Sequence, residues 1–195
     1  MSINRISQLF SIFYHLLKYN FISIIERMFY RLKGVRLGNG IRFYGFCRLY
    51  RKEGSTITIG NRVQFVSSSY VNHIGLNRKC SISTEEPDSE LIIGDGCGFS
   101  STNIIAFKSI RIGNNVRVGA NTVIMDSDFH LDDPRIKPAS PIVIDDNVWI
   151  GANVVVLKGV HIGENSVIGM NSVVTKDIPA NCIAAGNPCK VLQKK

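Results

Sequence analysis

The sequence predicts an all-β protein, a solenoid of short parallel strands preceded by one helix. Residues 144–179 divide into six hexads with nothing left over. The first position of every hexad is a β-branched aliphatic residue: Ile144, Ile150, Val156, Ile162, Ile168 and Val174. A helix buries every third or fourth residue and an ordinary strand every second one, so neither keeps a strict period of six. A solenoid does, because each turn stacks its inward side chain on the matching one below.

Two further hexad positions support this prediction. The fifth position is always small or β-branched: Val148, Val154, Val160, Ser166, Ser172 and Ile178. Glycine follows the aliphatic residue in three hexads, where the absence of a Cβ lets the chain bend: Gly151, Gly163 and Gly169. A β-sandwich of alternating strands is the competing interpretation, but it gives no reason for six hexads to stay in phase.

Residues 1–36 predict an amphipathic helical segment. Apolar residues recur three or four apart: Ile6, Leu9, Phe10, Phe13, Leu16, Leu17, Phe21, Ile24, Ile25 and Met28. The uncharged run ends before Lys18, well short of the ~20 residues that a membrane-spanning helix needs, and no signal-peptide cleavage site follows it. Two interpretations stay open. The helix packs on the solenoid or on a neighbouring subunit, or it lies on the anionic inner face of a membrane, with the basic residues among 27–36 at the headgroups.

Charge is distributed unevenly along the chain. Residues 1–60 contain ten Lys or Arg and two acids, and so carry the whole net charge of +8, whereas residues 61–195 contain thirteen of each sign. A nucleic-acid-binding protein would spread basic residues over its folded surface, so we expect no nucleic-acid partner. The five cysteines are odd in number and include no Cys-x-x-Cys pair: Cys47, Cys80, Cys97, Cys182 and Cys189. They indicate reduced, partly buried thiols of a cytoplasmic protein, and not a disulfide framework or a zinc site.

The hexad theme begins before residue 144, but the phase is often lost. Leu37-Gly-Asn-Gly, Ile59-Gly-Asn-Arg and Ile93-Gly-Asp-Gly restart it, yet thirty-four residues separate Ile59 from Ile93, which is not a multiple of six. Turns in this part must therefore carry extra residues. The stretch 78–90 is rich in serine and acids and contains a proline, so we expect it to be an exposed loop.

The phase breaks again at 125–141, in a stretch that contains the candidate chemistry. Three prolines and four aspartates exclude a helix or a central strand, so these residues form a loop that leaves the solenoid. The loop holds one histidine, His130, between acids. Histidine accepts a proton at neutral pH, and a carboxylate such as Asp126 or Asp128 can orient its ring. By composition alone, a solvated acidic loop whose histidine has no function is the more usual case.

Several strings resemble the hexapeptide-repeat acyltransferases: Asn147-Val-Trp-Ile-Gly-Ala-Asn-Val, Ile162-Gly-Glu-Asn-Ser-Val-Ile-Gly, Val173-Val-Thr-Lys-Asp-Ile-Pro and the ending Ala185-Gly-Asn-Pro-Cys-Lys-Val. The resemblance covers about residues 55–192 and is strongest to maltose, galactoside, nodulation-sugar and polysaccharide O-acetyltransferases. It implies a left-handed parallel β-helix over residues 37–192, with three hexads per coil, and a homotrimer. Handedness rests on the resemblance, since parallel crossovers are nearly always right-handed.

The resemblance also implies roles for residues of the loop. Asp-x-Asp-x-His followed by Pro134-Arg135 is similar to the family's catalytic loop, which makes His130 the catalytic histidine. Asp128 and Asp126 would orient its ring or bind the sugar, and the sequence does not separate these roles. Arg135 and Asn103 would contact the acceptor. Asn103 aligns loosely, so an ordinary turn asparagine is the alternative there.

For acetyl-CoA, the resemblance implies a groove along the regular coils. Gly151 and Ala152 would offer backbone groups to the pantetheine amides, with Trp149 lining the channel. The distal end and its phosphates would be reached by four residues: Gly169, Thr175, Lys176 and Lys190. The family's usual Gly-Ala-Gly is Gly169-Met170-Asn171 here, so a long side chain reshapes that turn. No metal is expected. Zinc-dependent carbonic anhydrases of similar solenoid type need three clustered histidines, and the loop contains only one.

These expectations define the predicted reaction. The chain would transfer an acetyl group from acetyl-CoA to a sugar hydroxyl in a surface polysaccharide (capsule, O-antigen or exopolysaccharide), with His130 taking the hydroxyl proton. The absence of a Gly-x-Ser-x-Gly elbow favours direct attack over an acyl-enzyme. Two alternatives stay open: N-acetylation of an amino sugar or another small amine, and a non-catalytic solenoid scaffold.

Overall fold

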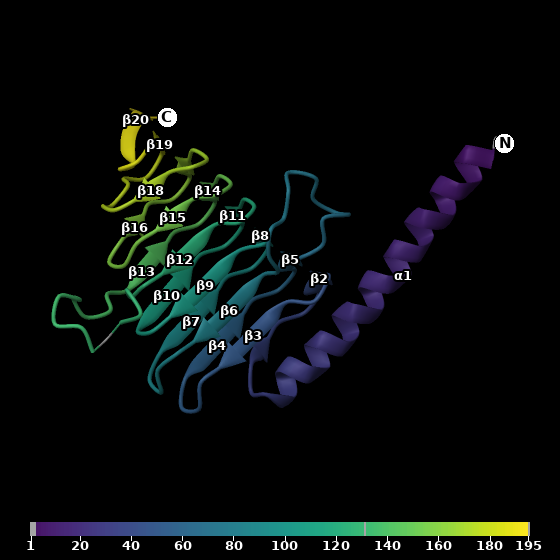
Figure 1. Cartoon of the computed structure of the whole chain (residues 1–195), viewed down its shortest axis with the longest axis horizontal. Helices are drawn as coiled ribbons and strands as arrows, with labels where there is room; N and C mark the ends of the chain where they lie inside the picture. The colour runs from purple at the N-terminus through teal and green to yellow at the C-terminus, as the bar shows by residue number, and fades with distance from the viewer. Residues whose placement is uncertain (1–2, 131, 195) are drawn as a thin grey trace.

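The computed structural model describes residues 3–130 and 132–194, with side chains at Ser11 and from Phe13 onward. The expected apolar side chains at Ile6, Leu9 and Phe10 lie outside the described ones. Helix α1 (Ile3–Leu32) comes first, and a solenoid of short strands follows it (Figure 1). The expected helical segment and β-solenoid are therefore both present.

The solenoid is built from three sheets, to which successive strands contribute in turn. Sheet A contains β1 (Arg36–Leu37), β4 (Thr56–Ile59), β7 (Glu90–Ile93), β10 (Ser109–Ile112), β13 (Ile142–Ile144) and β16 (His161–Ile162). Sheet B contains β2 (Arg42–Tyr44), β5 (Gln64–Val66), β8 (Gly98–Ser100), β11 (Arg117–Val118), β14 (Trp149–Ile150), β17 (Val167–Ile168), β19 (Cys182–Ala185) and β20 (Lys190–Lys194). Sheet C contains β3 (Arg48–Arg51), β6 (Ser81–Thr84), β9 (Asn103–Ala106), β12 (Val123–Met125), β15 (Val155–Val156) and β18 (Val173–Val174). All neighbouring strands are parallel except β19 and β20.

The hexad positions face the interior as predicted. Every first-position residue from Ile144 to Val174 is at most 1% exposed, and the fifth-position residues from Val148 to Ile178 are buried as well. The register stacks equivalent positions, as in the pairing of Ile144 with Ile162. Further toward the N-terminus three rings form a column, with Phe65 stacked 5.3 Å from Phe43 and 5.4 Å from Phe99. Core contacts between coils, rather than within one coil, therefore hold the solenoid together.

Asparagine at the fourth hexad position sets the corners between strands. Asn147 and Asn165 stand at this position and Asn181 follows the last hexad, and all three have φ between 57° and 59°. Asparagine tolerates this left-handed conformation better than other side chains that carry a Cβ. The side-chain amide of Asn147 donates a hydrogen bond to the side-chain oxygen of Asn165 over 3.2 Å, and the side-chain amide of Asn165 donates one to that of Asn181 over 3.0 Å. The corner residues thus form a ladder that runs along the solenoid.

Two excursions leave the solenoid, and one of them differs from the prediction. β12 ends at Met125 and β13 begins at Ile142, so the loop expected at 125–141 is present. The prediction of an exposed loop at 78–90 is wrong, because β6 lies within this stretch and pairs with β3 and β9. The extra residues instead leave between β5 and β6, at 67–80. The buried Ile82 holds the serine-rich stretch in sheet C.

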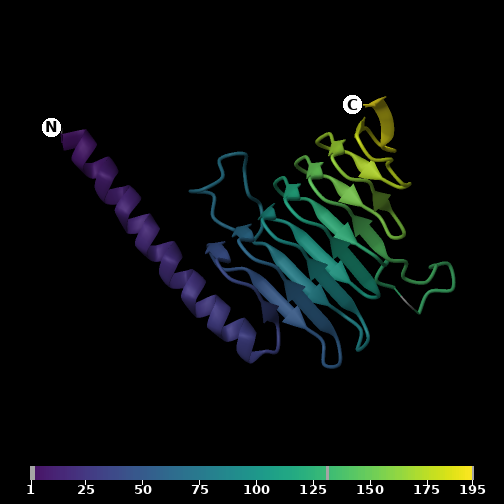
Figure 2. The same ribbon diagram turned by 180° about the vertical axis from the view of Figure 1, so that it is seen from behind.

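One face of α1 packs on the first coil. The buried side chains on this face are Tyr19, Ile22, Ser23, Glu26 and Tyr30. The Ser23 hydroxyl accepts a hydrogen bond from the Phe43 amide over 2.8 Å, and the Glu26 carboxylate accepts one from the Cys47 amide over 2.8 Å. The N-terminal part of the helix projects past the solenoid (Figure 2). No helix among residues 3–130 and 132–194 is long and apolar enough to cross a bilayer.

The five cysteines are part of the hydrophobic core. All five are free and buried. Burial raises the pKa of the Cys97 thiol to about 11 and raises the pKa values of Cys47, Cys80 and Cys189. They therefore act as small apolar core residues.

Candidate active site

The root of the loop is anchored to the preceding coil by Asp126. Its side chain is fully buried, and its carboxylate accepts hydrogen bonds from the amides of Phe107, Lys108 and Ser109 over 2.7, 2.8 and 2.7 Å. Its carbonyl accepts a fourth from the Ser140 amide over 2.9 Å, which brings the two ends of the loop together. The expectation that Asp126 contacts the acceptor is corrected here, because a carboxylate saturated by buried amides has no surface for a sugar.

Phe129 and His130 follow at the outer part of the loop. Phe129 has a φ of 69° and packs edge-on against Phe107, with ring centroids 5.0 Å apart. The backbone then turns, because the His130 amide donates to the Asp128 carbonyl over 2.9 Å. The His130 side chain is exposed, and its ring has no hydrogen-bond partner among the described residues. The imidazole is thus presented to solvent from an anchored backbone.

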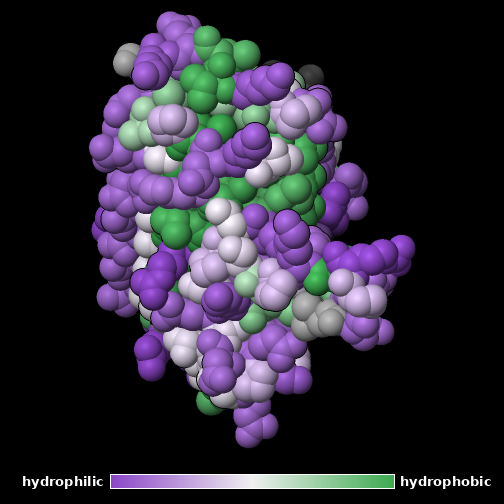
Figure 3. Space-filling model, turned by 90° about the vertical axis from the view of Figure 1, so that its left-hand side faces the viewer, coloured by the Kyte–Doolittle hydropathy of each residue, from purple (hydrophilic) through white to green (hydrophobic). Residues whose placement is uncertain are grey.

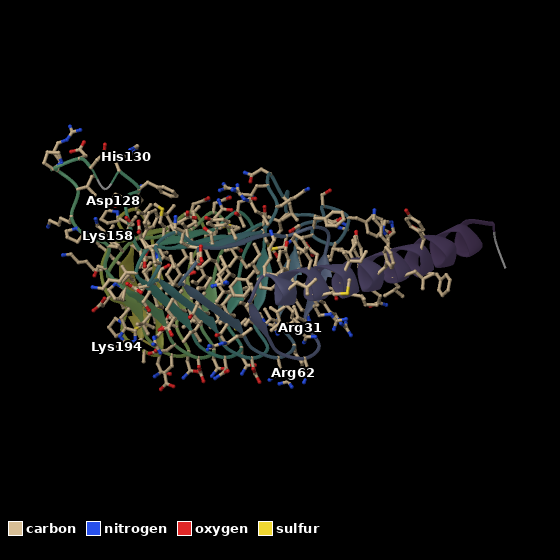
Figure 4. All side chains as sticks on the ribbon, turned by 90° about the horizontal axis from the view of Figure 1, so that it is seen from below. Arg31, Arg62, Asp128, His130, Lys158 and Lys194 are labelled. Atoms are coloured by element: carbon tan, nitrogen blue, oxygen red, sulfur yellow. The ribbon has the colours of Figure 1, made fainter. Side chains whose placement is uncertain are left out.

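Asp128 and Lys158 tie the loop to the following coil. The Lys158 ammonium group donates to the Asp128 carboxylate over 2.5 Å and to the Lys137 carbonyl over 2.7 Å. Its side chain is 17% exposed. In Figure 4, Lys158, Asp128 and His130 lie in that order from the solenoid outward. Asp128 therefore contacts an ammonium group and not the His130 ring, so its effect on the ring is exerted through the loop.

The distal part of the loop carries Arg135. Its guanidinium group contacts both carboxylate oxygens of Asp133, at 2.9 and 2.5 Å. This contact holds the pKa of Asp133 below its ordinary value. The Arg135 side chain is 86% exposed. Figure 3 shows the loop projecting from a surface on which apolar patches lie between polar side chains.

Asn103 lies at the N-terminal end of a strand of sheet C, whereas the loop leaves from the C-terminal end of the neighbouring strand. It begins β9 and pairs with Val123, whereas the loop starts after Met125, which pairs with Ile105. The Asn103 side chain is half-buried. Within the described residues Asn103 forms no hydrogen bond with His130.

The expected CoA residues around β14 form a second group. Trp149 is 61% exposed and lines a shallow hollow of about 240 Å³ on the outer face of sheet B. Gly151 and Ala152 form the corner between sheets B and C. A Cβ on Gly151 would lie 2.6 Å from the Met170 backbone nitrogen, so the close stacking of coils requires glycine there.

The backbone groups at this corner differ in availability. The Gly151 amide donates to the Ile168 carbonyl over 2.8 Å, and the Gly151 carbonyl accepts from the Thr122 hydroxyl over 2.9 Å. Of the backbone groups expected to bind pantetheine, the Gly151 amide is therefore already bonded within the solenoid. The Ala152 amide has no acceptor among the described residues, so it is the donor that remains.

The remaining expected CoA residues are spread over three places. Gly169 lies in the turn one coil beyond Gly151, beside the 60% exposed Met170. Thr175 and Lys176 are exposed after β18, at the same corner as the loop but two coils further along. Lys190 begins β20 in sheet B. These residues do not form one site within a single chain.

Sequence reasoning missed Lys158. It stands at the third position of an ordinary hexad, and nothing in its neighbours indicates an ion pair. The available signal is the coil length of three hexads. Ser140 lies where the loop returns to the solenoid, and Lys158 follows it by eighteen residues, which is one coil. The Gly159 amide does donate to the Ser140 carbonyl over 3.0 Å. Across residues 3–130 and 132–194, no group of three His, Cys, Asp or Glu side chains is arranged to hold a metal.

Two family profiles match the chain. The bacterial transferase hexapeptide profile (six repeats) matches residues 141–176, and the profile for the hexapeptide repeat of succinyl-transferase matches residues 90–125. The chain belongs to the hexapeptide-repeat acetyltransferase family. Both segments coincide with coils that the structure shows in register.

Curated members of the family show how far the likeness extends. A Saccharomyces cerevisiae protein, named provisionally as an acetyltransferase, is 42% identical over 112 residues, which cover 54% of this chain and 57% of that protein. The galactoside O-acetyltransferase of Lactococcus lactis is 47% identical over 90 residues, which cover 44% of this chain and 43% of the enzyme. The chain thus spans about half the length of the curated relatives that it matches.

Solved structures show the shared fold. A variant of AntD, an N-acyltransferase from Bacillus cereus, was solved with dTDP-4-amino-4,6-dideoxyglucose and coenzyme A. It aligns with a TM-score of 0.67 at 16% identity, covering 87% of this chain and 89% of that one. The solenoid is the left-handed β-helix of this acetyltransferase family.

Proposed function

We propose that this protein transfers an acetyl group from acetyl-CoA to a hydroxyl of a sugar acceptor. The observation that carries the proposal is the exposed, unpartnered imidazole of His130, held by a loop that is anchored to the coils on both sides. The likeness to a galactoside O-acetyltransferase supports a sugar hydroxyl as the acceptor group. We extend the proposal to the sugars of a surface polysaccharide, assembled from cytoplasmic precursors.

The chemistry assigned to His130 is general-base catalysis. A hydroxyl attacks a thioester slowly while it keeps its proton, and an imidazole within hydrogen-bond reach can remove that proton as the new ester bond forms. The CoA thiolate leaves and takes up a proton. Asp128 and Lys158 position the loop, and Arg135 and Asn103 are proposed contacts of the acceptor.

Acetyl-CoA is proposed to lie along the corner between sheets B and C. The Ala152 amide is a free donor for a pantetheine carbonyl, and Trp149 offers an exposed ring nearby. Gly169 would line the path one coil further along. Thr175 and Lys176 lie at the corner between sheets C and A and would reach the path from a neighbouring copy. Lys176 and Lys190 are exposed point charges for the phosphates. No metal is assigned a role.

A homotrimer would complete this site. Within one chain, sheet C separates the Ala152 corner from the His130 loop. The outward side chains of sheet C are aliphatic and half-buried: Ile105, Val123, Met125, Val155 and Val173. Covering them with a neighbouring copy removes apolar surface from water and can bring the loop of one chain to the CoA corner of the next.

The test is an acetyl-transfer assay with the full chain, [acetyl-14C]-labelled donor and galactoside acceptors. We expect label in the sugar fraction and its release by mild alkali, because esters hydrolyse under conditions that leave amides intact. Alkali-resistant label on amino sugars would replace the proposal with N-acetylation. Absence of both transfer and acetyl-CoA binding would support a scaffold instead.

A further inference from the structure

The face of α1 that points away from the solenoid is itself apolar. The buried residues Tyr19, Ile22, Glu26 and Tyr30 are spaced three or four apart and face the first coil. On the opposite side a second series follows the same spacing: Phe13, Leu17, Phe21, Ile24, Met28 and Leu32. At 3.6 residues per turn both series form straight stripes, about half a turn apart. We call the second series the outer stripe.

The outer stripe is strongly exposed. Its six side chains are between 56% and 81% exposed, although each is a large hydrophobe. The helix has thirty residues, so the stripe can extend over much of a rod about 45 Å long. Contiguous apolar surface of this size on a folded protein marks a contact surface. Intramolecular packing accounts for the inner face of α1 and leaves the outer stripe without an explanation.

The charges beside the outer stripe are all positive. Lys18, Arg27 and Arg31 flank it, and Lys33 follows the end of α1. Glu26, the one acid between Ile3 and Leu32, is buried on the inner face. The two arginines donate hydrogen bonds to backbone carbonyls, Arg27 to Ser23 and Arg31 to Leu37. Among the described residues, none of these four cations forms an ion pair with an acid.

Apolar and cationic groups meet in one hollow. A shallow depression of about 490 Å³ is lined by Ile24, Arg27, Met28, Arg31 and Leu32. Two guanidinium groups beside three apolar side chains match a phosphate that carries an acyl chain, since guanidinium binds phosphate oxygens well. Ten of the first sixty residues are basic, so the coil next to α1 extends the same positive field.

We propose that the outer stripe of α1 docks on an anionic phospholipid bilayer, with the helix lying in the plane of the interface. Apolar side chains would enter the boundary between headgroups and acyl chains, and the flanking cations would meet lipid phosphates. Pairing of two copies through this face is disfavoured, because it would set the cations of one helix beside those of the other with no exposed acid on either. The proposal is independent of the transfer reaction.

The test is co-sedimentation of the full chain with vesicles of phosphatidylcholine alone or mixed with phosphatidylglycerol. We expect binding to the mixed vesicles that weakens as salt is raised. Phe21→Asn combined with Met28→Gln should lower the vesicle partition coefficient by at least about tenfold. Because both side chains are exposed, the melting temperature should stay unchanged. Ile74→Asn, an equally exposed apolar position in loop 67–80, is the matched control and should bind like the wild type.

Two variants that each remove one positive charge test the electrostatic contribution to vesicle binding. Arg31→Gln and Lys18→Gln should each weaken binding to the mixed vesicles about fivefold, whereas Lys194→Gln, at the far end of the solenoid, should not (Figure 4). The proposal is overturned if the wild type stays in solution with mixed vesicles, or if it sediments equally with both vesicle types. It is also overturned if the Phe21/Met28 variant keeps vesicle binding but forms a smaller oligomer, which would assign the stripe to a second copy.

Discussion

The ammonium group of Lys158 lies 2.5 Å from the Asp128 carboxylate and also binds the Lys137 carbonyl. One side chain from the following coil thereby binds both the outgoing and the returning segment of the loop that carries His130. Asp126, at the root of the loop, is bound by three backbone amides of the preceding coil. The loop that carries the candidate base is therefore held by contacts with the coils on both sides.

Replacing His130 with alanine should remove the general base and leave the fold intact, because the side chain is exposed and contacts no described residue through hydrogen bonds. We expect a loss of about 10²–10⁴-fold in turnover, with unchanged acetyl-CoA affinity by calorimetry. His161→Ala is the control, since His161 is also exposed but pairs with Asp145 on sheet A. A His130→Ala enzyme with more than half of the wild-type rate would exclude this histidine from the mechanism.

Lys158→Met should loosen the loop without disturbing the core. We expect kcat to fall about tenfold while the acetyl-CoA affinity stays the same, because proper orientation of a catalytic group contributes to the rate. Lys137→Met is the matched control, since Lys137 contributes its carbonyl and not its side chain to the contact. Equal kinetics of both variants would show that the 2.5 Å contact has no positioning role.

Asp126→Asn should destabilise the loop root. An amide side chain would turn a donor toward the backbone N–H groups of Lys108 and Ser109, so at least one buried donor would lose its acceptor. We expect a loss of about 2–4 kcal/mol in the free energy of unfolding by urea denaturation. The exposed Asp132→Asn in the same loop should change it by less than about 0.5 kcal/mol. Two variants of equal stability would contradict the structural role of Asp126.

Glu26 should make stability depend on pH. Burial against the first coil raises its pKa to about 7 from 4.5, against the opposing effect of hydrogen bonds from the Cys47 amide and the Tyr30 hydroxyl. The folded chain therefore holds this proton more tightly than the unfolded chain. The contribution to stability is full below pH 4.5 and is lost progressively as the pH rises to about 7, by roughly 3 kcal/mol in all.

The measurement is the difference between wild-type and Glu26→Gln unfolding curves at several pH values. Glutamine keeps an acceptor for the Cys47 amide but does not ionise. Groups with lowered pKa values, such as Asp95 and Asp146, affect both proteins equally and cancel in the difference. The variant should gain relative stability between pH 4.5 and 7, and a flat difference would contradict the assignment.

Val155→Glu should break the proposed trimer. Val155 is an outward, half-buried residue of sheet C, and a charge there would lose its hydration on assembly. We expect light scattering to report a monomer with activity reduced at least about tenfold, because the site would be incomplete. Val143→Glu, the corresponding outward valine of β13 in sheet A, should stay trimeric and active. A wild-type monomer with full activity would refute the shared site.

The sequence by itself determined the solenoid and its loop. A period of six over residues 144–179 reports directly which side chains stack inward, since each coil repeats the contacts of the one before. The break of that period, together with prolines and aspartates, located the loop at 125–141 to within a residue. The same logic failed at 78–90, where the polar composition concealed the buried Ile82 that keeps β6 in sheet C.

Only the tertiary structure decided how the candidate site is held and which backbone donors beside it remain free. Contacts between coils join residues that are far apart in sequence, such as Lys158 with Asp128 and Asp126 with Ser109, and no local pattern encodes them. Burial turned Asp126 from a candidate sugar ligand into an anchor, and the hydrogen bond to Ile168 left Ala152 rather than Gly151 as the free donor. The amphipathic period of α1 was visible in the sequence, but which apolar stripe faces the solenoid and which faces outward depends on packing against the first coil.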